Sequence, residues 1–331
     1  MTVVGFVVGK FYPPHRGHKH LIDTARRQCD RLVVLLPHHP SQKIPGELRK
    51  SWLEEIHPDC EIHLVPDTLG PDDTQGWADF TVAHLGGRPP DVVFSSEDYG
   101  PRFAACMGCR HAMVDRDRTT FPISGTRVRQ SPLECLDYLE PCVRAHFVRR
   151  VVLVGAESTG KTTLAQMLAE RFDTAWVPEY GREYCEGKMG GLDPTGPLPP
   201  WTSAEFLHIA AEQQRREDHA ARTANKVLVC DTNAFATGLW HERYMGSRSA
   251  DVDAIGARDK ADLYLLTEPD FPFVQDGLRD GEHVRDWMHG RFVEELSKLP
   301  TPVLPLRGSL DSRIGQAGKA IEQLIREPYD L

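Results

Sequence analysis

The sequence predicts an α/β fold with two domains, each a doubly wound parallel sheet. Short runs rich in β-branched residues alternate with longer helical segments along the whole chain, which is typical of parallel sheets with helices on both faces. The chain is 331 residues long, which gives room for two domains of ordinary size. We place the boundary at His146, so that residues 1–146 form the first domain and residues 147–331 the second.

Composition and charge exclude several functions. The net charge of −9 disfavours binding to a polyanion, so we expect no nucleic-acid partner. No apolar run approaches the ~20 residues needed to cross a bilayer, so we expect no membrane partner. The first residues are typical of a core strand and not of a signal peptide, and the eight cysteines lack the pattern of a secreted scaffold. These features predict a cytoplasmic protein, and a homo-oligomer is compatible with them.

The first half alternates strands and helices. Strands are expected at residues 3–8, 32–37, 61–65, 91–94 and 111–114, and helices at residues 19–29, 47–56 and 77–85. A further helix over residues 132–147 closes the first domain.

Residues 9–18, GKFYPPHRGH, follow the first strand and change character abruptly. Two prolines force a rigid turn, Gly17 permits close backbone approach, and Lys10, His15 and His18 gather cationic or hydrogen-donating groups. A single histidine would be interpreted as a surface residue. The spacing His15-x-Gly17-His18 after a strand, however, resembles the signature of the nucleotidyltransferase superfamily. We therefore expect this turn to bind a nucleotide through Gly9, Lys10, Phe11 and Gly17.

The second signature of that superfamily is the ISGTxxR run that begins at Ile123. Ser124 and Thr126 are also good helix N-caps, and a capped helix start with Arg129 one turn later is itself a phosphate site. The chemistry that these residues suit is adenylyl transfer, in which a phosphate monoester attacks the α-phosphorus of ATP and expels pyrophosphate. The nucleophile is already an anion, so hydrogen bonds and positive charge on the phosphates lower the barrier and no general base is needed.

Residues 151–172, VVLVGAESTGKTTLAQMLAERF, contain a phosphate-binding loop between a strand and a helix. Lys161 is expected to reach the β- and γ-phosphates of ATP, and the Thr162 hydroxyl to hold Mg2+. The N-terminus of the helix adds a partial positive charge. The remaining nucleotide contacts are expected at Gly155, Glu157, Ser158, Thr159, Gly160 and Thr163.

The rest of the second half supplies carboxylates and a candidate lid. Strands are expected at residues 175–177, 226–230, 261–266 and 301–306, a helix at 203–224 and a long loop at 187–201. Asp231 ends one strand and is the candidate ligand for Mg2+. Phosphoryl transfer to a neutral hydroxyl needs a base, and we prefer Glu179 for that role. Arg279 and Arg285 flank an acidic segment that could bring cations onto the transferred phosphate, although either could be a surface arginine.

The order GKFYPPHRGH, ISGTRVR, GAESTGKT, EYGRE, CDT and VQDGLRD resembles the bifunctional NadR-type proteins. These join a nicotinamide mononucleotide adenylyltransferase, with a Rossmann-like nucleotidyltransferase fold, to a P-loop ribosylnicotinamide kinase. The resemblance implies that the second domain makes nicotinamide mononucleotide from ribosylnicotinamide and ATP. It also implies that the first domain converts this product and ATP into NAD and pyrophosphate. Some members carry an N-terminal helix-turn-helix that makes them repressors; here the first strand leaves no room for one, and we expect no operator binding.

The resemblance also implies roles for particular residues. His15, His18, Ser124 and Arg129 would serve the adenylyl site, while Lys161, Thr162, Glu179 and Asp231 would serve the kinase. The family stacks an aromatic side chain on the cationic nicotinamide ring, for which Trp176 and Tyr180 are candidates, with Arg182 also near the substrate. This sequence departs from the family pattern in having Pro178, and not tryptophan, directly before Glu179.

Other interpretations keep the folds and change the function. The first domain could adenylylate phosphopantetheine or a flavin phosphate, and the second could phosphorylate a deoxynucleoside. Both sites could instead bind nucleotides without turnover, as in a nucleotide-sensing regulator.

Overall fold

The computed structural model describes residues 2–70, 72–189, 200–258, 260–274 and 282–331. The chain divides into two compact units, of which one runs up to Arg144 and includes Pro328–Leu331, and the other is Ala145–Glu327. The predicted domain boundary assigns the last four residues to the second domain. The structure places them on the first unit, where Asp330 Oδ2 pairs with Lys43 Nζ at 2.8 Å.

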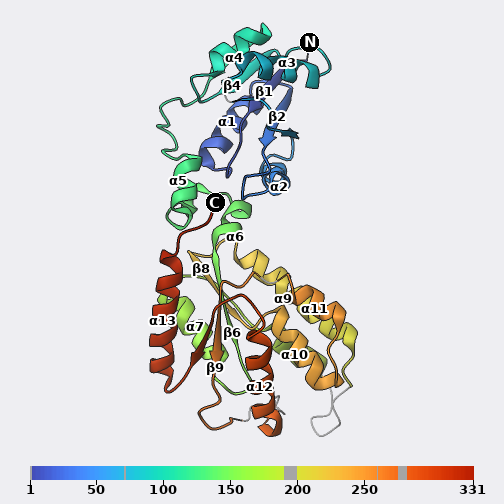
Figure 1. The fold of residues 1–331 in the computed structure, drawn as a ribbon, viewed down its shortest axis with the longest axis vertical. Coiled ribbons are helices and arrows are strands. Elements are labelled where there is room, and N and C mark those ends of the chain that lie inside the picture. Colours follow the sequence, from blue (N-terminus) through green and yellow to red (C-terminus); the bar gives the residue numbers. More distant parts are fainter. Residues whose placement is uncertain (1, 71, 190–199, 259, 275–281) are drawn as a thin grey trace. The chain divides into compact units, whose positions relative to one another are not determined.

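Each unit is built on one parallel sheet, as predicted (Figure 1). In the first unit the strands of the described residues follow the order β3-β2-β1-β4-β5, and every pairing is parallel. The strands are β1 Val4–Val8, β2 Arg31–His38, β3 Glu61–Pro66, β4 Val92–Ser95 and β5 Arg110–Met113. The helices are α1 Arg16–Arg26, α2 Gly46–Ile56, α3 Thr74–His84, α4 Gly100–Met107 and α5 Gly125–Gln130.

Strand β1 is buried on both faces and lies at the centre of its sheet. Successive side chains of a strand point to opposite faces, so Phe6 packs with residues of α3 and α4, whereas Val7 packs with residues of α1 and α2. Strand order reverses on either side of β1, and ligands of such sheets bind where the order reverses. The GKFYPPHRGH turn leaves β1 at this point.

In the second unit the strand order is β10-β9-β6-β8-β7 within the described residues, again with parallel pairings. The strands are β6 Arg149–Val154, β7 Trp176–Val177, β8 Val227–Asp231, β9 Leu263–Thr267 and β10 Val303–Leu306. The helices are α6 Pro141–Phe147, which spans the division between the units, and α7 Lys161–Arg171, α8 Tyr180–Met189, α9 Ser203–Ala220, α10 Ala234–Met245, α11 Ala250–Gly256, α12 Arg285–Leu296 and α13 Leu310–Arg326.

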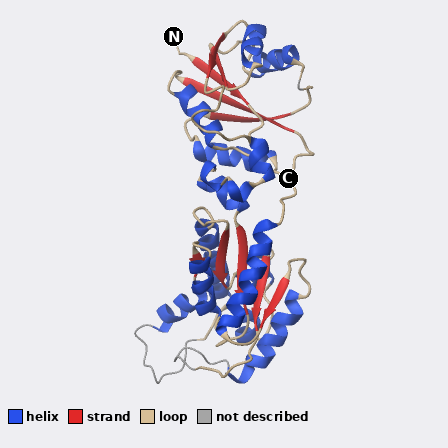
Figure 2. Ribbon diagram, turned by 90° about the vertical axis from the view of Figure 1, so that its left-hand side faces the viewer, coloured by secondary structure: helices blue, strands red, loops and turns tan. Residues whose placement is uncertain are grey.

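Helices cover both faces of the second sheet (Figures 1 and 2). Helices α7 and α13 pack together on one face through a cluster that includes Leu164, Leu168 and Ile321. Helices α9, α10 and α11 form a second cluster around Phe206. The central strand β6 leads directly into the phosphate-binding loop, which is again the point where strand order reverses.

Two predicted segments differ from the structure. Residues 132–147 do not form one helix, because Pro141 lacks the N–H that a helix interior needs. Two 3-10 turns, Pro132–Glu134 and Leu136–Tyr138, precede α6, which starts at that proline. The predicted loop at 187–201 is also shortened, since α8 continues through Met189; residues 190–199 lie outside the described residues. Across the described residues, no helix combines the length and the apolar character needed to cross a membrane.

Candidate active sites

The turn after β1 places two histidines against each other. His15 caps helix α1, because its Nδ1 accepts a hydrogen bond from the backbone N–H of His18 at 3.3 Å. The two imidazole rings stack with centroids 3.7 Å apart. A side chain on Gly17 would place its Cβ 3.1 Å from His15 Cε1, so it would crowd the His15 ring. Since His15 Nδ1 is an acceptor, the proton of the neutral ring lies on Nε2, which is then a donor.

Both histidines are neutral near pH 7. Burial and the nearby Arg118 lower the pKa of His15 to about 4. Burial, His15 and Arg118 also hold the pKa of His18 well below its usual value. Each ring can therefore donate one hydrogen bond, but neither supplies a positive charge.

The two nucleotidyltransferase motifs meet at the backbone of Tyr12. Arg129 Nη1 donates to Tyr12 O at 2.6 Å. Gly125 packs so closely that a Cβ there would lie 2.8 Å from the same oxygen. Ser124 Oγ accepts from Arg127 N at 3.2 Å and caps α5. The glycine of ISGT is thus required by close backbone approach, and the motif is fixed to the turn.

These residues line a cavity of about 500 Å³ in the first unit. The predicted site residues that line it are Gly9, Lys10, Phe11, His15, Gly17, His18, Ser124, Thr126 and Arg129. Lys10 Nζ also pairs with Asp67 Oδ2 at 2.8 Å. Arg118, which is not among the predicted site residues, also lines the cavity, from the loop between β5 and α5.

A second cavity of about 540 Å³ adjoins the first and shares Val8, Gly9, Lys10 and Tyr99 with it. Trp77 lines this second cavity and provides an aromatic surface, while Asp67 provides a carboxylate. The pair of cavities therefore offers room for two ligands that meet beside the end of β1.

The phosphate-binding loop of the second unit has the backbone conformation that anion binding needs. Ser158 and Gly160 both have positive φ, of 57° and 81°. Residues that alternate between right- and left-handed conformations turn successive N–H groups toward one point. Lys161 Nζ donates to the carbonyls of Gly155 at 3.0 Å and Ala156 at 2.9 Å. The loop forms as predicted from GAESTGKT.

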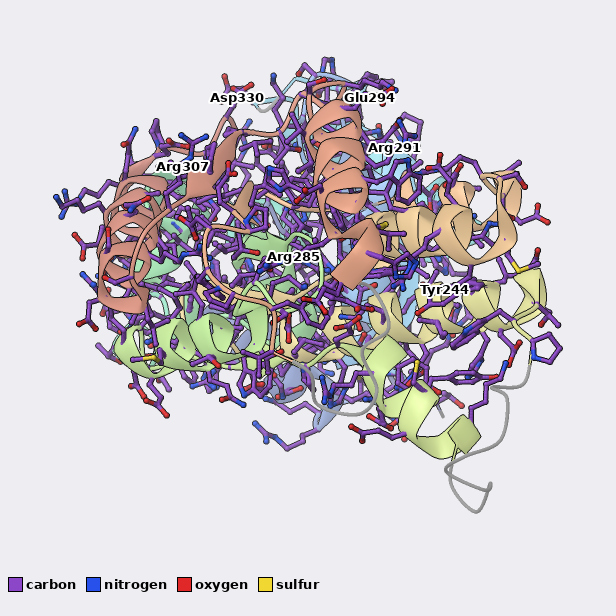
Figure 3. All side chains as sticks on the ribbon, turned by 90° about the horizontal axis from the view of Figure 1, so that it is seen from below. Tyr244, Arg285, Arg291, Glu294, Arg307 and Asp330 are labelled. Atoms are coloured by element: carbon purple, nitrogen blue, oxygen red, sulfur yellow. The ribbon has the colours of Figure 1, made fainter. Side chains whose placement is uncertain are left out.

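Two buried arginines hold the outer side of this loop. Arg285 begins α12 (Figure 3) and donates through Nη2 to the carbonyl of Ser158 at 2.9 Å. Arg313 of α13 donates through Nη1 to the carbonyl of Thr159 at 3.0 Å. In a trans peptide the N–H points away from the carbonyl, so these bonds aim the N–H groups of Thr159 and Gly160 toward the phosphate side. Arg285, a lid or surface residue in the sequence analysis, is instead a buried support of the loop.

Two carboxylates lie at the ends of strands β7 and β8. Thr162 Oγ1 donates to Asp231 Oδ2 at 2.5 Å, while the buried Oδ1 has no hydrogen-bond partner among the described residues. Burial raises the pKa of Asp231, partly offset by Lys161. Burial, with an added contribution from Asp231, raises the pKa of Glu179 to about 7. Gln213 fixes the start of α8 beside Glu179 by accepting from Tyr180 N at 2.9 Å.

A cavity of about 170 Å³ joins the loop to Glu179 and Gln213, whereas Asp231 is not among the residues that line it. The predicted site residues that line it are Glu157, Ser158, Thr159, Gly160, Lys161, Thr162, Thr163, Glu179 and Arg182. Arg243 of α10 pairs with Glu157 at 2.8 Å and so fixes the loop on its far side. Arg279 lies outside the described residues.

The aromatic wall of this cavity differs from the expected one. Trp201, Trp240 and Tyr244 line the cavity, and the Trp201 and Tyr244 ring centroids are 5.4 Å apart. Trp176 instead packs on the core cluster beside α7. Tyr180 contacts His208 and lies under the Arg216 guanidinium, away from the cavity lining. The structure therefore does not bring the two expected aromatic residues to the kinase cavity.

Two family models match the chain in the order of its two units. A cytidylyltransferase-like model matches residues 6–131, and an AAA domain model matches residues 150–313. The chain is also similar to two solved structures over nearly its whole length. One is a NadR protein in complex with NAD and AMP-PNP, with a TM-score of 0.74, 20% identity, and coverage of 100% of this chain and 98% of that one. The other is a NadR protein in complex with NR, with a TM-score of 0.75, 20% identity, and coverage of 96% and 97%.

Two curated relatives are closer in sequence. Both are named trifunctional NAD biosynthesis/regulator protein NadR, one from Salmonella typhimurium and one from Escherichia coli. Each is 31% identical to this chain, over 297 and 300 residues, and each alignment covers 83% of this chain and 71% of the relative. The solved structures share the fold, and identity over this share of both sequences shows that the chain belongs to the NadR family.

Proposed function

We propose that this chain makes NAD in two steps, phosphorylating ribosylnicotinamide in its second unit and adenylylating nicotinamide mononucleotide in its first. One observation carries the proposal: a single chain contains both the His15–His18 nucleotidyl turn, joined to Arg129, and a phosphate-binding loop with two carboxylates. The names of the relatives and the ligands of the related structures agree with it. We assign the activities to residues 1–146 and 147–331, and the family models, which fall on either side of His146, support this division.

In the first unit, the phosphate of nicotinamide mononucleotide attacks the α-phosphorus of ATP. We assign His15 Nε2–H and the N–H of His18 as donors to oxygens of the reacting phosphate, and Arg129 and Lys10, which also have partners within the protein, as positive charge beside the triphosphate. No proton has to be removed, because the attacking phosphate oxygen is already anionic. The cavity lined by Trp77 suits the acceptor, since its pyridinium ring is cationic and gains ~0.5–2 kcal/mol over an aromatic face.

In the second unit, the hydroxyl of ribosylnicotinamide attacks the γ-phosphorus of ATP. Glu179, with its pKa raised to about 7, is suited to accept the hydroxyl proton. Lys161 and the N–H groups of the loop bind the β- and γ-phosphates. Trp201, Trp240 and Tyr244 provide the aromatic surface for the pyridinium ring.

The residues at the end of β8 suit a magnesium ion. Asp231 Oδ1 is a buried oxygen without a hydrogen-bond partner among the described residues. The Thr162 hydroxyl donates a hydrogen bond to the other oxygen of that carboxylate. A carboxylate and a hydroxyl, completed by phosphate oxygens and water, form the small oxygen donor set that Mg2+ takes in kinases. We propose that Thr162 and Asp231 would hold Mg2+, which would neutralise charge on the phosphates during the transfer.

The partners are ATP, ribosylnicotinamide, nicotinamide mononucleotide and NAD, and the net charge of −9 works against binding to nucleic acid. All eight cysteines lie within the described residues and none of them forms a disulfide, which is the state that a reducing compartment maintains. We therefore place both reactions in the cytoplasm.

Product analysis tests the proposal. The purified chain is incubated with Mg-ATP and either ribosylnicotinamide or nicotinamide mononucleotide, and the products are separated by chromatography. We expect NAD from both substrates, with nicotinamide mononucleotide as the intermediate from the first. Failure to form NAD from the mononucleotide would contradict the proposal. Turnover of phosphopantetheine or a deoxynucleoside would then favour another substrate, and ATP binding without turnover a regulator.

A further inference from the structure

Few of the basic side chains that line the cavity of the first unit carry a positive charge that is available to a ligand. The side chains with basic groups that line it are Lys10, His15, His18, Arg118 and Arg129. Burial leaves both histidines neutral near pH 7. Adenylyl transfer nevertheless expels pyrophosphate, a highly charged leaving group, and cations on that group lower the barrier.

Two of the remaining three cations are already engaged. Lys10 Nζ pairs with Asp67 Oδ2 at 2.8 Å. Arg129 uses Nη1 on Tyr12 O at 2.6 Å and Nη2 on Thr126 Oγ1 at 3.2 Å, and its guanidinium lies over the Tyr12 ring. Arg129 thereby joins the two motifs, which restricts how far it can turn toward a ligand.

Arg118 differs from both. Its Nη2 pairs at 2.8 Å with Glu97 Oε1, a carboxylate that is 55% exposed and lines the same cavity, and the Arg118 side chain is 43% exposed. The guanidinium lies close enough to His15 and His18 to lower the pKa of each. Arg118 lines the same cavity as His15 and His18, and it can exchange an exposed ion pair for a phosphate at little cost.

The loop that carries Arg118 is well fixed. Asp115 Oδ1 accepts from Thr119 N at 2.9 Å and from Thr119 Oγ1 at 3.0 Å, and Arg118 N donates to Asp115 O at 2.9 Å. Arg118 itself has a φ of 52°, a conformation that L-residues other than glycine rarely adopt. A strained backbone held in place by hydrogen bonds is typical of positions whose side chain has a function.

We propose that Arg118 binds the pyrophosphate that leaves during adenylyl transfer, an inference that rests on the proposed function of the first unit. The acceptor phosphate oxygen forms a bond to the α-phosphorus, and the bond from that phosphorus to the α–β bridging oxygen breaks. The electron pair stays on the bridging oxygen, and the charge spreads over the departing phosphates. The Arg118 guanidinium donates to oxygens of this group, and no proton is transferred.

The backbone conformation of Arg118 allows its side chain to be removed without disturbing the loop. Glycine is favoured at a φ of 52°, so Arg118→Gly removes the guanidinium without straining the loop. Arg116→Ala is the matched control, because Arg116 lies two residues earlier, pairs with Asp98 at 2.7 Å, is 59% exposed and does not line the cavity.

We expect Arg118→Gly to lower kcat/KM for NAD formation on the order of 10²-fold. In the reverse reaction, KM for pyrophosphate should rise more than KM for NAD, a split that loss of loop structure alone would not produce. Added guanidinium should restore part of the rate. Arg116→Ala and the kinase activity of Arg118→Gly should stay unchanged.

The outcomes separate this inference from the proposed function. If the unchanged protein forms NAD and Arg118→Gly does so with the same kcat and the same KM for pyrophosphate, the inference is wrong and the function stands. If the unchanged protein forms no NAD from nicotinamide mononucleotide, both are wrong. If Arg118→Gly unfolds, Arg118→Lys decides, since lysine keeps the charge but loses the forked donors and should raise KM for pyrophosphate in folded protein.

Discussion

Thr162 Oγ1 donates to Asp231 Oδ2 at 2.5 Å, which ties the start of helix α7 to the end of strand β8. We expect Asp231→Asn to lower kinase kcat on the order of 10²-fold or more, because the variant loses the anionic oxygen proposed for Mg2+. The Mg2+ concentration for half-maximal phosphorylation should rise, and NAD formation from nicotinamide mononucleotide should not change. A kinase with unaltered Mg2+ dependence would contradict this role.

The two arginines behind the phosphate-binding loop predict a defect in nucleotide binding. Each hydrogen bond from a charged group contributes ~1.5–3 kcal/mol, so Arg285→Met or Arg313→Met should raise the kinase KM for ATP roughly 10- to 100-fold. The KM for ribosylnicotinamide should change much less. Arg307, which is labelled in Figure 3, provides the control Arg307→Met. Its side chain is 73% exposed and pairs with Glu268 at 3.3 Å. Equal effects of all three changes would show that the loop carbonyls need no such support.

The raised pKa of Glu179 predicts the pH dependence of the kinase. A base must be deprotonated, and the pKa of about 7 in the free protein means that kcat/KM should rise with pH through 7 and then level off. Glu179→Gln should lower the rate roughly 10²- to 10⁴-fold and remove this ascending limb. The adenylyl reaction of the same protein serves as the control. An ascending limb that persists near pH 7 in Glu179→Gln would assign the titration to another group.

The aromatic wall of the kinase cavity predicts substrate selectivity. Trp240→Ala should raise KM for ribosylnicotinamide roughly 2- to 30-fold, the equivalent of ~0.5–2 kcal/mol of cation–π attraction, and leave KM for ATP near its original value. Trp176→Phe, which changes a tryptophan on the core beside α7, should leave both KM values unchanged. The opposite pattern would restore Trp176 as the stacking residue.

Motifs that are local in the sequence were predictable, and contacts between distant segments were not. His15, His18 and the loop around Lys161 each lie within a few residues of their partners, so spacing alone located them. Trp176 was misplaced because side chains of a strand alternate in direction, and β7 contains only Trp176 and Val177. Two residues are too few to show an alternating hydrophobic pattern, so the sequence does not indicate which face of the sheet the Trp176 side chain lies on.

The supporting arginines gave no such signal either. Arg285 and Arg313 donate hydrogen bonds to the backbone carbonyls of Ser158 and Thr159, which lie 127 and 154 positions earlier in the chain. Every residue has a backbone carbonyl, so the acceptor in such a hydrogen bond cannot be recognised from the amino-acid sequence. Arg118 likewise stands in a polar loop whose backbone conformation is visible only in three dimensions.

Two variants of the whole chain test the central claim most directly. Lys161→Ala should abolish the conversion of ribosylnicotinamide while NAD still forms from nicotinamide mononucleotide. His18→Ala should stop NAD formation from the mononucleotide while ribosylnicotinamide is still phosphorylated. Chromatography of both reactions for both folded variants gives the answer: opposite losses are the predicted result, and loss of both reactions in either folded variant would contradict the division into two sites.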